Sequence, residues 1–252
     1  MAKPEASAGK LIELWDWPLR VFHWSLVLSV STAIATGLLG GSWMPVHAIA
    51  GELIAGLLAF RLAWGFFGSS HARFRQFVPG PRRLLAYLKG RWTGVGHNPL
   101  GALSVVALLT LLLVQVATGL VGNDDIAFQG PLASLVSEAT SHRLTGVHHL
   151  LVKVLYGLLA LHLAAIAFHL HVKKDNLVSP MVTGKKLVPK ETTEPRRYSL
   201  AALVSAGLIG LVAALMPGGL AWWSTAHDNT DQPPQPEHAT ASTTASQATP
   251  GW

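Results

Sequence analysis

The chain contains no cysteine among its 252 residues. This absence excludes iron–sulfur clusters, thiolate zinc sites and disulfide bonds, and it excludes covalently attached c-type haem, which needs a C-x-x-C-H motif. Charge is also scarce, because Asp, Glu, Lys and Arg together make up 13% of the chain, whereas about 25% is usual in soluble domains. Half of the residues are hydrophobic, so the composition is that of a membrane protein.

Five apolar segments are long enough to cross a bilayer as helices, which takes about 20 mostly apolar residues each. These segments are residues 19–39, 47–67, 100–121, 147–171 and 200–216. We therefore predict an all-α membrane protein with a four-helix core over residues 19–181 and a fifth, C-terminal transmembrane helix.

The remaining segments differ in composition from the five apolar runs. Residues 1–18 form an N-terminal segment, residues 182–199 form a basic linker, and residues 217–252 are rich in Pro, Ser, Thr, Ala and Gln. Such a tail buries too little apolar surface to fold, and Pro217 is expected to end the fifth helix. Residues 81–88 form either a short amphipathic helix on the membrane surface or an ordinary basic loop.

Basic residues alternate between the two ends of the predicted helices. They gather before the first helix, between the second and third, and after the fourth, whereas residues 40–46 have none and residues 122–146 have only Arg143. The positive-inside rule then predicts a cytoplasmic N-terminus, and five crossings place the C-terminus outside. The net charge of +6 thus reports orientation, and we expect no nucleic acid partner.

Four histidines lie at matching depths in the predicted helices. His23 is near the inner end of the first helix, His47 is near the outer end of the second, and the fourth helix carries His148 and His162. The last two are fourteen positions apart, which returns to nearly the same helix face after a rise of about 21 Å. Ionisable groups inside membrane helices usually mark function.

Two haems stacked across the membrane, each between two imidazoles, would need this arrangement. A packing or interfacial role is the plainer reading for any one histidine alone, but it explains four matched depths less well. His169 is the rival inner ligand, although His148 and His169 are about 31 Å apart by helix rise, the full thickness of the hydrocarbon layer. The other histidines, His71 and His97 among them, are expected to be solvated. His149 is expected instead to pack or to support a ligand.

Three further residues fit the same geometry. Arg61 is fourteen residues after His47 at inner depth, where its guanidinium could pair with a haem propionate or could simply anchor the helix at the interface. Gly37 and Gly51 are small residues at outer depth. They would make room for a ring, or serve plain helix packing.

Several motifs resemble the prokaryotic cytochrome b561 family, which is grouped with the b-type cytochrome subunits of nickel–iron hydrogenases. The first is WDWPLRVFHW at residues 15–24, and the next are HAIAG at 47–51 and RLAWG at 61–65. Thr118-Gly119 and the stretch from His148 through His162 to KDN at 174–176 continue the resemblance. It covers about residues 14–181, and the fifth helix and tail are additions to the family pattern.

The resemblance implies a di-haem bundle in the bacterial inner membrane. His23 and His162 would ligate the inner haem b, and His47 and His148 the outer one. Such proteins pass electrons between quinone (ubiquinone or menaquinone) and a c-type cytochrome, a hydrogenase or another dehydrogenase. One branch of the family oxidises superoxide, so a superoxide:quinone oxidoreductase is an alternative.

Other classes of function stay open at this point. A histidine-lined metal or proton transporter would need a continuous polar path, yet Gln115 is nearly alone in the third and fifth helices. An intramembrane metalloenzyme and a plain membrane anchor are the remaining alternatives. Quinone oxidation would need a proton acceptor, for which the outer candidates are Asp124, Asp125, Glu138, His142 and Glu52.

Overall fold

The structure is a computed structural model of the chain, and it describes residues 9–92, 94, 96–124, 128–190 and 192–228. Its long helices are α1 (Trp17–Leu39), α2 (Met44–Phe67), α5 (Pro99–Leu120), α6 (Glu138–His171) and α8 (Leu200–Asp228). All five are long and apolar enough to span a membrane. The predicted all-α membrane fold is therefore confirmed.

The helices begin where side-chain caps and prolines favour a start. Asp16 accepts a 2.8 Å hydrogen bond from the amide of Leu19 ahead of α1, and Asn98 accepts one of 2.8 Å from Gly101 ahead of α5. Both helices have a proline in their first turn, where a missing N–H costs nothing. Polar caps in an apolar sequence thus fix where these spans begin.

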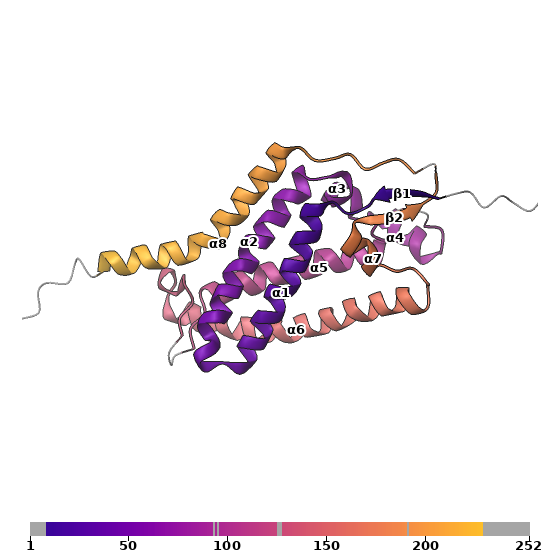
Figure 1. Cartoon of the computed structure of the whole chain (residues 1–252). Coiled ribbons are helices and arrows are strands. Elements are labelled where there is room, and N and C mark those ends of the chain that lie inside the picture. The colour runs from indigo at the N-terminus through magenta and orange to yellow at the C-terminus, as the bar shows by residue number, and fades with distance from the viewer. Residues whose placement is uncertain (1–8, 93, 95, 125–127, 191, 229–252) are drawn as a thin grey trace, which may run out of the picture.

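Helix α2 occupies the middle of the bundle. It packs against α1, α5 and α8, and α5 also packs against α6. Figure 1 shows α8 running beside α2 and then bending away from the bundle. The contact with α8 is close, because a Cβ on Gly56 would lie 2.6 Å from the carbonyl oxygen of Gly210. Small residues let two membrane helices approach in this way.

Short elements close the ends of the bundle. They are η1 (Gly41–Trp43), η2 (Ser70–Ala72), α3 (Phe74–Phe77), α4 (Pro81–Leu88), η3 (Ala133–Leu135) and α7 (Val178–Thr183). The amphipathic helix expected at 81–88 is α4, which buries none of its residues against the rest of the chain. Its exposed leucines, Leu85 and Leu88, fit a position on a membrane surface.

A two-stranded antiparallel ribbon was not expected from the sequence. Strand β1 (Lys10–Glu13) pairs with β2 (Lys185–Val188), so that Lys10 lies opposite Val188. The segment before α1 and the basic linker after α6 are therefore joined directly. Ser70 also exchanges hydrogen bonds with Arg196. The three basic segments thus meet at one end of the bundle.

Two predicted boundaries were wrong. Helix α8 runs through Pro217 to Asp228, because proline removes only one backbone hydrogen bond and a membrane helix tolerates it. Pro217 itself is fully buried. Helix α6 begins at Glu138, nine residues earlier than expected, because Ser137 caps it. The rest of the predicted tail, residues 229–252, lies outside the described residues.

Candidate functional site

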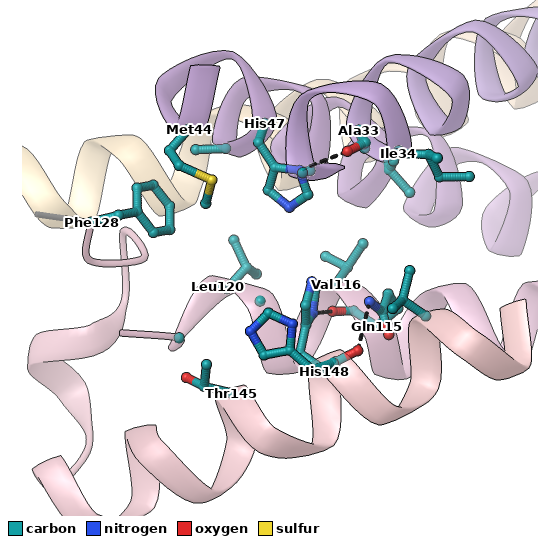
Figure 2. A pocket seen from close by; sticks show the side chains of 18 of the residues that line it. Ala33, Ile34, Met44, His47, Gln115, Val116, Leu120, Phe128, Thr145 and His148 are labelled. Carbon is teal, nitrogen blue, oxygen red and sulfur yellow. Dashed lines mark hydrogen bonds between the residues drawn. The ribbon is translucent and has the colours of Figure 1, made fainter. Parts of the chain in front are cut away.

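His47 of α2 and His148 of α6 face one another across a pocket between the helices (Figure 2). Their ring centroids are 6.1 Å apart. When one nitrogen from each of two imidazoles binds the same metal ion at about 2.0 Å from opposite sides, the two ring centroids lie roughly 6 Å apart. The two side chains are therefore already at the separation that a shared metal ion requires.

The second nitrogen of each ring is held by the backbone. Nδ1 of His47 lies 2.8 Å from the carbonyl oxygen of Ala33, and Nδ1 of His148 lies 2.9 Å from that of Gln115. When Nδ1–H donates to a carbonyl, Nε2 is left unprotonated and free to bind a metal. Both rings are thus held in the tautomer that leaves Nε2 able to bind a metal ion.

The pocket offers space for a large apolar group beside the two imidazoles. Its volume is about 420 Å³, and its walls are mostly apolar side chains from α1, α2, α5 and α6. Gly51 lines this pocket, and a Cβ added there would meet nothing within 4 Å. A planar macrocycle between helices needs such an open face, so the residues present fit a haem.

Two glycines make room for the ligand rings themselves. A Cβ on Gly119 would lie 2.9 Å from Cε1 of His148, and one on Gly37 would lie 3.1 Å from Cε1 of His47. The sequence indicated Gly37 as a small residue at outer depth, but it pointed to Gly119 only through the resemblance. In the structure both glycines let neighbouring helices seat the imidazoles closely.

Gln115 is a supporting residue that the sequence marked only as an isolated polar side chain in α5. Its Nε2 donates a 3.1 Å hydrogen bond to the carbonyl oxygen of His148, and its own carbonyl faces that ring. Thr118 lies one turn further on, with its Oγ1 3.4 Å from Nδ1 of His148. Gln115 therefore holds α6 at the height of the ligand, a role that a lone polar residue in an apolar helix could have suggested.

The inner pair, His23 of α1 and His162 of α6, is less tightly arranged. The two residues lie close enough to interact electrostatically, but no ring contact joins them. Nδ1 of His23 is buried and has no hydrogen-bond partner. The inner histidines are thus brought to the same region, and His23 has no described backbone acceptor of the kind that holds each outer ring.

His169, the rival inner ligand, uses both of its ring nitrogens within the chain. Nδ1 lies 3.0 Å from the carbonyl oxygen of Ala165, and Nε2 lies 3.2 Å from the side-chain nitrogen of Asn98. Asn98 also caps α5. This ring therefore links α6 to the start of α5, which favours His162 as the inner ligand.

Arg61 is buried near the inner end of α2, with 2% of its surface exposed. Its guanidinium carbon is 4.7 Å from the ring centre of Phe74 and 5.6 Å from that of Phe77. Nη1 is buried without a hydrogen-bond partner. An interfacial anchor would extend into water, so this structure disfavours the anchoring alternative.

We expected His71 and His97 to be solvated loop residues, and this was wrong. The loop between α2 and α5 folds back onto Trp15, whose ring centroid is 4.5 Å from that of His97 and 6.4 Å from that of His71. Both imidazoles have a buried nitrogen without a partner. Burial, and secondarily the positive charge of Arg61, lowers the pKa of His97 to about 4.

The outer carboxylates are spread over three places. Asp124 lines the outer pocket and accepts a 2.9 Å hydrogen bond from the amide of Phe128. Glu138 lies 3.8 Å from His142 at the exposed start of α6. Glu52 faces α8, because a Cβ on Gly218 would be 3.7 Å from its carboxylate. Asp125 lies outside the described residues.

Opposed, backbone-oriented imidazoles in an apolar pocket between membrane-length helices define a haem-binding membrane protein of the b type, since the chain has no cysteine for covalent attachment. The family model for prokaryotic cytochrome b561 matches residues 14–184. The chain belongs to the prokaryotic cytochrome b561 family, and it is a multi-pass membrane cytochrome of electron transfer.

Individual relatives agree with this family. A Rhizobium leguminosarum bv. viciae protein named "Probable Ni/Fe-hydrogenase B-type cytochrome subunit" is 25% identical over 228 residues, which cover 73% of this chain and 94% of that protein. A protein of the same name from Azotobacter chroococcum mcd 1 is 26% identical over 214 residues, covering 70% and 88%. The "Probable Ni/Fe-hydrogenase 1 B-type cytochrome subunit" of Escherichia coli K12 is 22% identical over 137 residues, covering 42% and 57%. No solved structure matches the chain.

Proposed function

We propose that this cytochrome holds two b haems and carries electrons across the bacterial inner membrane between the quinone pool and a redox partner. The observation that supports it most directly is the outer pair, because His47 and His148 are 6.1 Å apart with both Nδ1 atoms directed to carbonyl oxygens. A packing role alone would not need two imidazoles that face one another with free Nε2 atoms.

His47 and His148 are the proposed axial ligands of the outer haem, and His23 and His162 those of the inner one. Bound haem supplies an iron that accepts and releases one electron at a time. The chain keeps this centre dry and fixed in place, through the apolar lining of the outer pocket and the carbonyls of Ala33 and Gln115. Four ligands on three helices would place one haem near each face of the membrane.

Arg61 is the proposed partner of a propionate of the inner haem. Nη1 is buried without a hydrogen-bond partner among the described residues, and this supports the role, because an unsatisfied buried donor is costly and a carboxylate would satisfy it. Phe74 and Phe77 hold the guanidinium in place. In this role Arg61 would orient the inner haem from α2 while its iron is held from α1 and α6.

The proposed partners follow from the family and the relatives. A nickel–iron hydrogenase, another dehydrogenase or a periplasmic c-type cytochrome would exchange electrons with one haem, and ubiquinone or menaquinone with the other. Asp124 is the carboxylate best placed to take a quinone proton, because it lines the outer pocket. The basic segments that meet at one end of the bundle support a cytoplasmic N-terminus and a periplasmic C-terminus.

The test is a haem count on the purified protein. Reduced-minus-oxidised spectra and a pyridine haemochrome assay on protein in detergent should give b-type bands and two haems per chain. One haem per chain would contradict the di-haem assignment while leaving the outer site intact. Absence of b-type bands would contradict the whole proposal.

A further inference from the structure

A group of buried nitrogen atoms at the inner end of the bundle lacks acceptors. Nη1 of Arg61, Nδ1 of His97 and Nε2 of His71 are each buried and have no hydrogen-bond partner among the described residues. They come from α2, from the residues just before α5 and from η2. Leaving one such group unpaired costs about 1–3 kcal/mol, and more when it is charged, so three together point to a missing acceptor.

Aromatic rings bring these three side chains together. Phe77 packs against the ring of His97 at 5.1 Å between centroids and against the guanidinium of Arg61. Trp15 packs against both His97 and His71. The donors therefore share one region, walled by Trp15 and Phe77, rather than three separate places.

Among the described residues, the fixed positive charge of this region is Arg61, because burial lowers the pKa of His71 and of His97 and so favours their neutral forms. Arg61, His71, His162 and His23 all act electrostatically on His97. Asp16 is the nearby carboxylate that interacts with Arg61, but its oxygens already accept hydrogen bonds from Leu19 and from Nε1 of Trp64. An acidic group from outside the polypeptide would supply acceptors for the three donors.

We propose that Arg61, His71 and His97 together bind the carboxylates of the inner haem. The proposal rests on the proposed function, because His23 and His162 act on His97 electrostatically and are the proposed ligands of that haem. It adds two binding residues from the connection between α2 and α5, outside the long helices themselves. The guanidinium supplies the charge, and each neutral imidazole donates one N–H.

Infrared spectroscopy of the full, haem-loaded chain tests this proposal. His47→Ala removes the outer haem, so that the spectrum reports the inner one, and haem is labelled with carbon-13 at its carboxyl groups. Reduced-minus-oxidised difference spectra should then show carboxylate bands that shift when Arg61→Met or His97→Phe removes a donor. His97→Gln keeps a donor and should shift the bands less, and it covers the case in which His97→Phe does not fold.

Arg73→Met is the matched control, because Arg73 lies in the same loop but donates to the carbonyl oxygen of Gly68 at 2.8 Å. It should leave the carboxylate bands unchanged. Equal bands in the parent and in all of these variants would overturn the proposal even with inner haem bound. Loss of all haem in His47→Ala would instead remove the di-haem assignment, and this inference with it.

A free anion is the competing source of the same chemistry. Inorganic phosphate added to the parent protein would then raise its thermal unfolding midpoint, and Arg61→Met would abolish the rise, while the labelled carboxylate bands stayed fixed. That result would reassign the region to a free phosphate or to a lipid headgroup and overturn the haem assignment. We expect no effect of phosphate on the haem-loaded chain.

Discussion

His47 and His148 stand 6.1 Å apart across the outer pocket although 101 positions separate them in the sequence. Each is oriented by a backbone carbonyl of another helix, Ala33 of α1 for His47 and Gln115 of α5 for His148. All four helices of the core therefore contribute to the position of this one pair.

Replacing either outer histidine should remove one haem and leave the other. His47→Ala and His148→Ala each delete one of the two axial ligands, so we expect the pyridine haemochrome count to fall from two per chain to one. His149→Ala is the control, because His149 is an exposed neighbour of His148 with its ring centroid 6.2 Å away. A count that fell equally for His149→Ala would contradict the assignment.

A methyl group on Gly119 should disturb the outer site by displacing the ring of His148. The added Cβ would be 2.9 Å from His148, so the ring must move or α5 and α6 must separate, at a cost of about 1–3 kcal/mol. We expect Gly119→Ala to shift the outer haem band and lower its occupancy. Gly207→Ala, which meets nothing within 4 Å, should leave the spectrum unchanged.

The inner ligand can be decided by one pair of variants. His162→Ala should remove the inner haem, whereas His169→Ala should keep it, because both nitrogens of His169 are engaged with Ala165 and Asn98. The haem count and the remaining absorption band measure the outcome. The reverse result would show that the argument from membrane depth fails.

His97 should make the haem-free chain sensitive to acid. Burial, and secondarily Arg61, lowers its pKa from 6.5 to about 4, so between these values the unfolded chain binds one more proton than the folded chain. Acidification from pH 6.5 to 4 should therefore lower the free energy of unfolding, by at most about 3 kcal/mol. Above pH 6.5 this contribution is fully present and constant.

Thermal midpoints of haem-free protein in detergent at pH 7.5 and pH 5 measure the effect. His97→Gln should reduce the drop between the two pH values. Haem loading should reduce it as well, because nearby carboxylates favour the protonated imidazole. A drop of the same size in His97→Gln would show that other groups carry the acid sensitivity.

The contact between α2 and α8 should affect stability without touching the haems. A side chain at Gly210 meets the carbonyl oxygen of Gly56 at 2.9 Å and Phe60 at 3.0 Å. Gly210→Leu should therefore push α8 away from α2 and lower the thermal midpoint, with the haem count kept at two. Loss of the outer haem in this variant would mean that α8 supports the pocket through α2.

The bundle could be predicted because each span is a long apolar run, and the depth of each histidine follows from its place within its run. This reasoning predicted His47 and His148 at the same membrane depth, and in the structure their rings face one another. The ligand roles stay predictions. Spacing alone could not give the acceptors, since Ala33 and Gln115 contribute backbone carbonyls that any residue type could supply.

The misjudged features depend on contacts between distant segments. His71 and His97 read as loop residues because their burial comes from Trp15, which precedes α1. The ribbon was missed because each strand has only four residues and its partner is about 170 positions away. The prediction that Pro217 ends the last helix was wrong for another reason. A proline that ends a helix in water can lie inside a helix whose surroundings are apolar.

The ribbon also sets an order of events during synthesis. Strand β2 follows α6, so β1 must wait at the membrane surface until the fourth span has been made and inserted. Helices α1, α2 and α5 have by then left the ribosome, whereas His148 and His162 arrive together on α6. The ribbon can thus close the inner end of the bundle only after all four helices of the core have been made.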